Sequence, residues 1–128
     1  MEALTMALFG EAEKGEYNIP YLCQSLPQLI EYLGSPPPES HGLYYAIQAL
    51  LYHRKILFFR VQEEGFSLHD YQKGIKILQD HLVYPKLAAI CVPGLGDSQT
   101  IQIIINLCFL KNSVLITTEA DLYDYLTA

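Results

Sequence analysis

The feature that most constrains this chain is a regular alternation of short apolar segments with helical patterns. Four apolar segments of strand-like length occur, at residues 3–9, 56–61, 87–92 and 114–117. Between them, apolar residues recur at spacings of three and four, which is typical of amphipathic helices. Because parallel strands must be joined by crossover connections, and these are usually helices, the alternation predicts a mainly parallel sheet with helices packed on it.

Capping residues set the predicted helix boundaries. Ser25 can begin a helix that ends at Gly34, and Ser40 can begin a second helix that follows it directly. The clearest helix follows Ser67, with apolar residues at regular helical spacing: Leu68, Tyr71, Ile75, Leu78 and Leu82. Gly74 within that helix predicts a close approach to the sheet. Asp97 or Ser98 caps a helix over 98–111, and Thr118 caps a last short one.

This order of elements predicts a single α/β domain over residues 1–128. The class is a small Rossmann-like or flavodoxin-like three-layer sandwich, with about four parallel strands and helices on both faces. For the four strands we expect the order 2-1-3-4, which creates a topological switch between the first and third strands. The length of 128 residues fits one compact domain.

Composition excludes several classes of function. The chain has 8 Lys and Arg against 14 Asp and Glu, for a net charge of -6, so we expect no nucleic-acid binding, which needs a basic face. The longest apolar run, 103–110, is far shorter than the roughly 20 residues of a membrane span, and the first residues lack a basic leader pattern. Three cysteines in apolar surroundings fit a reducing compartment, so we expect a cytoplasmic protein without a membrane segment.

The carboxyl ends of the predicted strands are where a ligand is expected, because ligands of open parallel sheets bind at that edge. Seven carboxylates fall in the loops that follow the strands. Glu11 and Asp97 flank the expected switch, so they are the catalytic candidates and would be Mg²⁺ ligands if the protein used a metal, although no established metal motif accompanies them. The ligand-binding candidates are Gly10, Glu11, Glu13, Gly94, Gly96, Asp97, Ser98, Thr118 and Glu119.

The loop after the third strand, Pro93 to Thr100, offers glycines and a helix N-terminus, a combination that can hold an anion. It resembles the PGGxGTxxE loop of the lysine decarboxylase-like nucleotide-binding phosphoribohydrolases. The proline and two glycines match, whereas Leu95 replaces the second glycine and the catalytic glutamate is absent. The resemblance covers about eight residues and implies a nucleotide-like ligand without the hydrolytic residue.

Three interpretations therefore remain at the sequence level. The carboxylates could bind a metal, the glycine loop could bind a phosphate or nucleotide, or the carboxylates could simply stabilise helix N-termini. The last interpretation does not cover the acidic loop 11–17, which precedes the first helix by about ten residues. Four histidines are expected on helices away from the strand-end edge: His41, His53, His69 and His81.

Surplus apolar and aromatic surface gives the leading functional hypothesis. The stripe on helix 98–111 is wider than one sheet face requires, and the chain has ten tyrosines, a residue enriched at protein interfaces. We therefore expect a binding or interaction module that self-associates or binds a protein partner, with loop 11–17 as the contact region. The alternative is an enzyme of the hydrolase or transferase class that acts on a nucleotide-like or phosphate ligand, with or without Mg²⁺.

Overall fold

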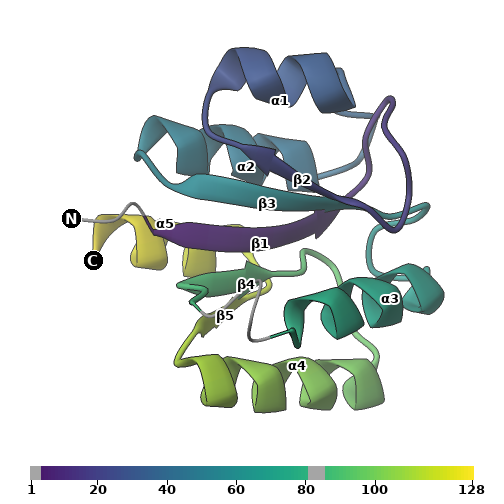
Figure 1. Cartoon of the computed structure of the whole chain (residues 1–128), viewed down its shortest axis with the longest axis vertical. Helices are drawn as coiled ribbons and strands as arrows, with labels where there is room; N and C mark the ends of the chain where they lie inside the picture. Colours follow the sequence, from purple (N-terminus) through teal and green to yellow (C-terminus); the bar gives the residue numbers. More distant parts are fainter. Residues whose placement is uncertain (1–3, 81–85) are drawn as a thin grey trace.

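The computed structural model describes residues 4–80 and 86–128, and these residues form five strands and five helices (Figure 1). The strands are β1 (Thr5–Gly10), β2 (Pro20–Cys23), β3 (Lys55–Arg60), β4 (Ala89–Cys91) and β5 (Val114–Ile116). The helices are α1 (Leu26–Leu33), α2 (Gly42–Leu51), α3 (Leu68–Leu78), α4 (Ser98–Lys111) and α5 (Glu119–Thr127). The predicted α/β class is confirmed.

The five strands form one sheet in the order β2-β3-β1-β4-β5. β1 pairs in parallel with both β3 and β4, and β4 pairs in parallel with β5, whereas β2 runs antiparallel to β3. The full order differs from the predicted 2-1-3-4 because a fifth, antiparallel strand lies at the edge, whereas the four predicted strands, which are β1, β3, β4 and β5, keep the predicted order. The four parallel strands lie in the order β3-β1-β4-β5, and the loops after β1 and β4 flank the point where the connections change direction.

β2 was not predicted, because its leucine fits a helical series better than a strand. Leu22 lies four residues before Leu26, the first residue of α1, so the local pattern continues into the helix. Strand pairing decides instead: Leu22 lies opposite Leu57 of β3, and Cys23 lies opposite Ile56. That pairing joins residues more than thirty positions apart, which a local pattern does not reveal.

Alternation along β1 divides the core into two layers. Met6 and Leu8 face one side of the sheet and pack with α1, α2 and α5, whereas Ala7 and Phe9 face the other side and pack with α3 and α4. All four of these side chains are fully buried. β1 is therefore apolar throughout, as expected of a strand covered on both faces. The result is a three-layer arrangement with the sheet in the middle (Figure 1).

Gly74 of α3 confirms the predicted close approach of that helix to the sheet. A Cβ atom built on Gly74 would lie 2.3 Å from Cε2 of Phe9 and 3.2 Å from Cδ1 of Phe59. Phe9 in turn stacks on Phe59 and on Tyr71, with ring centroids 4.7 and 5.4 Å apart. A larger residue at position 74 would therefore displace the aromatic centre of this layer.

Helix caps agree with the sequence at four of the five helices, with one correction. Ser25, Ser67, Asp97 and Thr118 are the N-cap residues of α1, α3, α4 and α5. The predicted Ser40 cap of α2 is wrong: the N-cap is His41, and the Ser40 hydroxyl donates instead to the carbonyl of Pro37. The predicted extension of α3 to Leu82 and the position of His81 lie outside the described residues.

None of the described helices is both long enough and apolar enough to span a lipid bilayer.

Candidate functional site

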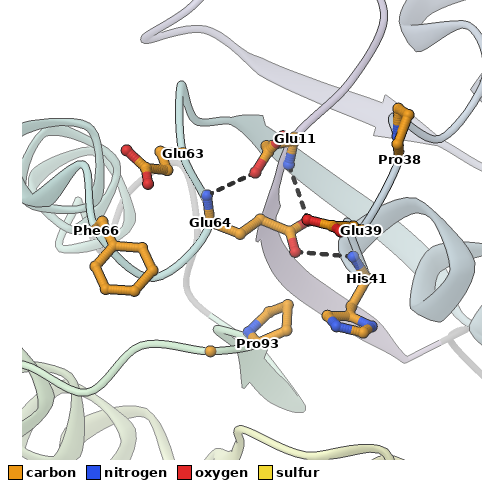
Figure 2. Close-up of a pocket in the computed structure, with 9 residues that line it drawn as sticks. Glu11, Pro38, Glu39, His41, Glu63, Glu64, Phe66 and Pro93 are labelled. Carbon is orange, nitrogen blue, oxygen red and sulfur yellow. Dashed lines mark hydrogen bonds between the residues drawn. The ribbon is translucent and has the colours of Figure 1, made fainter.

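A pocket of about 470 Å³ opens at the carboxyl ends of β1, β3 and β4 (Figure 2). Its walls come from four loops that are distant in the sequence but adjacent in the fold. The lining residues are Glu11 after β1; Pro38, Glu39 and His41 before α2; Glu63, Glu64 and Phe66 after β3; and Pro93 and Gly94 after β4. The pocket therefore lies at the sheet edge where a ligand of a parallel α/β fold is expected.

The Glu64 carboxylate organises this pocket, because it accepts three backbone hydrogen bonds, of which Figure 2 shows those from Glu11 and His41. Its Oε1 accepts from the amides of Glu11 at 3.0 Å and Gly42 at 2.7 Å, and its Oε2 accepts from the amide of His41 at 2.8 Å. The donors at His41 and Gly42 are the free N–H groups at the start of α2, which carry the positive end of the helix dipole. Glu64 thus caps α2 although it lies more than twenty positions after the start of that helix.

The Glu11 side chain in turn binds the backbone of Glu64. Its Oε2 accepts a hydrogen bond from the Glu64 amide at 3.0 Å, so each glutamate side chain binds the backbone of the other. The two glutamates lie 53 positions apart in the sequence. A hydrogen bond from an amide to a carboxylate is stronger than one between two neutral groups. This reciprocal pair of bonds therefore holds the loops after β1 and β3 together.

Two glycines permit this geometry. A Cβ on Gly10 would lie 2.7 Å from the Cα of Gly42 and 2.9 Å from Oε1 of Glu64. The end of β1 and the start of α2 therefore pass in direct backbone contact, and Glu64 reaches both. Gly10, a predicted ligand-binding residue, lies behind the glutamate pair and does not line the pocket.

The electrostatics of the pocket oppose an anionic ligand. Glu11, Glu39, Glu63 and Glu64 all line it. The α2 amides, which would be the natural seat for a phosphate, already donate to Glu64. The predicted phosphate or nucleotide ligand therefore finds carboxylates at the position where it needs donors.

Asp97, the second catalytic candidate, does not line the pocket with Glu11. Its Oδ2 accepts hydrogen bonds from the Thr100 hydroxyl at 2.7 Å and from the Thr100 amide at 3.0 Å, so it caps α4. These hydrogen bonds hold the pKa of the exposed Asp97 carboxyl below its ordinary value. Within the described residues, no group of three or more His, Cys, Asp or Glu side chains is arranged to hold a metal ion.

The remaining predicted site residues are spread around the same edge. Gly94 lines the pocket and has a φ of 78°, whereas Gly96 and Ser98 are exposed beyond it. Thr118 caps α5 by accepting a hydrogen bond from the amide of Asp121, and Glu119 begins that helix. The structure thus brings Glu11 and Gly94 to the pocket and gives helix-capping positions to Asp97 and Thr118.

Seven of the nine lining residues are not among the predicted site residues: Pro38, Glu39, His41, Glu63, Glu64, Phe66 and Pro93. Glu39 and Phe66 come from connecting segments that carry no motif, and Phe66 is 72% exposed at the rim. His41 was expected away from this edge, and that expectation is wrong, because α2 begins at the strand-end side of the sheet. The signal that could have found His41 is its position immediately before the second helical pattern.

The acidic loop 11–17 is fastened to the fold. Besides the Glu11 bond, the Glu13 carboxylate accepts a hydrogen bond from the amide of Ser35. Arg60 donates to the carbonyl of Gly15, and its guanidinium lies over the ring of Tyr17, 4.5 Å from the centroid. Two of the acidic side chains that suggested a contact region are therefore engaged within the chain.

A second surface of a different kind lies on α4. Its exposed side carries four large apolar side chains, and we call these residues the α4 outer face: Ile103, Ile105, Phe109 and Leu110. Phe109 is 86% exposed and Leu110 is 71% exposed. Lys111, the only charged residue of α4, is buried. Burial also lowers the pKa of its ammonium group. The exposed side of α4 thus carries no charged side chain, and its polar residues include Gln99, Gln102 and Asn106.

The α4 helix lies at one end of the molecule, beyond β5 in Figure 1. Its opposite side provides the buried contacts of the second core layer, through Ile104, Leu107 and Cys108. Apolar residues therefore occur all around this helix, a pattern typical of a helix covered on both sides. Among the described residues, no other helix has as many exposed large apolar side chains.

Comparisons of the chain with protein-family models, with curated proteins and with solved structures found no significant match.

Proposed function

We propose that this protein is an interaction module that self-associates through the α4 outer face. The observation that carries the proposal is the exposure of Ile103, Ile105, Phe109 and Leu110 on one helix surface without charge. Monomeric proteins rarely leave contiguous apolar patches larger than about 300–600 Å² in water. Aromatic residues such as phenylalanine are also enriched at the buried centres of protein interfaces.

The α4 outer face supports this role better than loop 11–17 does. Glu11 and Glu13 already hold backbone amides of the same chain, so a partner that used them would have to replace those bonds. Covering Phe109 costs no internal contact, and about 25 cal/mol is gained for each Å² of apolar surface removed from water. We therefore propose a homodimer with α4 at its centre.

The alternative is an enzyme with a nucleotide-like ligand in the pocket, as a Rossmann-like arrangement would favour. The location at the strand ends supports it. The four lining carboxylates and the Glu64 cap on α2 count against a phosphate, with or without Mg²⁺. The interaction module remains the function that the geometry supports best.

A cytoplasmic location is part of the proposal. Cys23, Cys91 and Cys108 are all free and buried. Burial raises the pKa of the Cys23 and Cys108 thiols to about 11. Free buried thiols of this kind are typical of proteins in a reducing compartment.

Sedimentation velocity over a wide concentration range tests the proposal. The wild-type chain should pass reversibly from monomer to dimer, and Phe109→Ser should weaken the dimer at least about tenfold, as loss of an interface centre does. The matched control is Phe66→Ser, which removes another exposed phenylalanine at the pocket rim and should leave the association unchanged. A wild-type chain that stays monomeric at every concentration would contradict the proposal.

A further inference from the structure

We propose that two copies of this chain pack α4 against α4 in antiparallel orientation, about a two-fold axis at Asn106. This inference rests on the proposed self-association and adds its geometry and the residue that sets it. The exposed side of α4 has two adjacent rows at spacings of three and four: Gln102, Ile105 and Phe109 form one, and Ile103, Asn106 and Leu110 form the other. This spacing is the one by which helices pack side by side.

Charge favours a second copy as the occupant. The chain has a net charge of -6, so two copies repel each other wherever carboxylates meet. The exposed side of α4 carries no charged residue, and two copies can therefore meet there without desolvating an ion. A partner chosen by opposite charge would find nothing on this face to pair with.

The neighbouring helix α3 differs from α4 in its exposed charges. α3 packs beside α4 on the same side of the sheet, and its exposed positions include Lys73 and Lys76. Of these two helices, only α4 has no exposed charged residue. A helix of a second copy can therefore lie on α4 without covering the lysines of α3.

The polar residues within this surface are also self-complementary. The side-chain amide of Gln102 donates to Oδ1 of Asn106 at 3.1 Å. A carboxamide carries two N–H donors and an oxygen with two lone pairs, so one amide can both donate to and accept from its symmetry mate. In an isologous interface each residue meets the same surface on the other subunit, and an amide satisfies that condition where a charge does not.

Asn106 sets the register. A two-fold axis at this residue places Asn106 opposite itself and Ile103 near Leu110 of the partner subunit, because the axis pairs each row of α4 with its own copy. Shifting the register would bury the Asn106 amide against aliphatic side chains and leave its hydrogen bonds unmade, which costs about 1–3 kcal/mol. A single polar residue in an apolar helix seam is a known determinant of register.

The size of the surface predicts a weak, reversible dimer. A helix of 14 residues is about 21 Å long, so one helix pair covers less than the roughly 800 Å² per partner of a standard interface. Interfaces below that size are typical of transient contacts. We therefore expect a dissociation constant on the order of 1–100 µM.

Site-directed disulfide crosslinking tests the orientation. Asn106→Cys should form a disulfide-linked dimer under mild oxidation, because a two-fold axis places the two thiols within bonding distance. Gln99→Cys is the control on the same helix, since antiparallel packing holds its two copies about 20 Å apart and should prevent the crosslink. The native cysteines are buried and should not react.

A second pair of variants avoids any dependence on cysteine. Asn106→Asp should weaken the dimer at least tenfold in sedimentation, because two carboxylates would face each other at the axis, and Gln99→Asp should weaken it far less. Equal crosslinking of Asn106→Cys and Gln99→Cys would contradict the antiparallel register. An Asn106→Asp variant that dimerises as strongly as the wild-type chain would contradict a two-fold axis at Asn106. If the wild-type chain dimerises but neither cysteine variant crosslinks, only this geometry is refuted. If the wild-type chain stays monomeric, the proposed function is refuted as well.

Discussion

The pocket at the carboxyl edge and the α4 outer face differ in how their exposed groups are satisfied. In the pocket, the carboxylates of Glu11 and Glu64 bind backbone amides of the same chain across 53 positions of sequence. On α4, the apolar side chain of Phe109 is 86% exposed to solvent. The pocket carboxylates thus stabilise the fold through bonds within the chain, whereas the α4 outer face leaves large apolar side chains exposed.

Two helices on the same side of the sheet sharpen this difference. Both α3 and α4 bury one side in the second core layer. The exposed side of α3 has lysines, which keep a helix surface in water, whereas the exposed side of α4 has isoleucine, phenylalanine and leucine. The same architecture therefore presents a solvated surface and an apolar one next to each other.

The largest expected effect comes from removing the Glu64 carboxylate. Glu64→Ala leaves the amides of Glu11, His41 and Gly42 without their acceptor and should lower the free energy of unfolding by about 2–3 kcal/mol. Urea denaturation measures this loss, and the self-association of the folded variant should be unchanged. Glu63→Ala is the control, because that neighbouring side chain is exposed and should cost no more than about 0.5 kcal/mol. Equal losses for the two variants would show that Glu64 does not organise the pocket.

A smaller effect is expected at the start of α4, as a function of pH. Hydrogen bonds from Thr100 lower the pKa of Asp97 in the folded chain, so the unfolded chain takes up the proton first as the pH falls. The stabilisation is complete above the ordinary aspartate value of 3.8 and is lost as the pH falls through the lower folded value. Asp97→Asn, which keeps a good N-cap residue, should lose this part of the pH dependence in denaturation experiments. An unchanged pH profile would remove Asp97 from the account.

The smallest expected effect is none at all, and it concerns the pocket as a nucleotide site. Phosphate, nucleoside phosphates and Mg²⁺ should not raise the melting temperature of the wild-type chain, because Glu64 already occupies the α2 amides. A ligand that binds only the folded state stabilises it by RT ln(1 + [L]/Kd). A concentration-dependent rise with a nucleotide, lost in Glu11→Ala, would restore the enzymatic alternative and reverse the comparison of the two surfaces.

Local signals in the sequence predicted much of the fold. The serine and glycine that bound α1, the apolar series of α3 and the Asp97 cap of α4 all depend on contacts within a few residues. β2 was missed because its assignment depends on pairing with β3, and a four-residue segment has too little pattern to reveal that. Gly74 was read correctly because a glycine inside a strong helix pattern implies a close approach.

The candidate site was less predictable for the same physical reason. The sequence indicated that Glu11 lies at the carboxyl edge, but no local pattern shows that Glu64 would cap α2 in place of Ser40. The over-wide stripe of α4 was visible in the sequence, whereas the side that stays exposed depends on where α4 meets the sheet. Contacts between distant segments thus decide which residues remain available for a partner.

The most direct test of the central claim is a concentration series of NMR spectra with labelled isoleucine, leucine and phenylalanine side chains. If α4 is the contact surface, the signals of Ile103, Phe109 and Leu110 should shift or broaden as the concentration rises, whereas those of Phe66 at the pocket rim should not. Concentration-dependent changes at Phe66 without changes on α4, or no changes anywhere, would contradict the account.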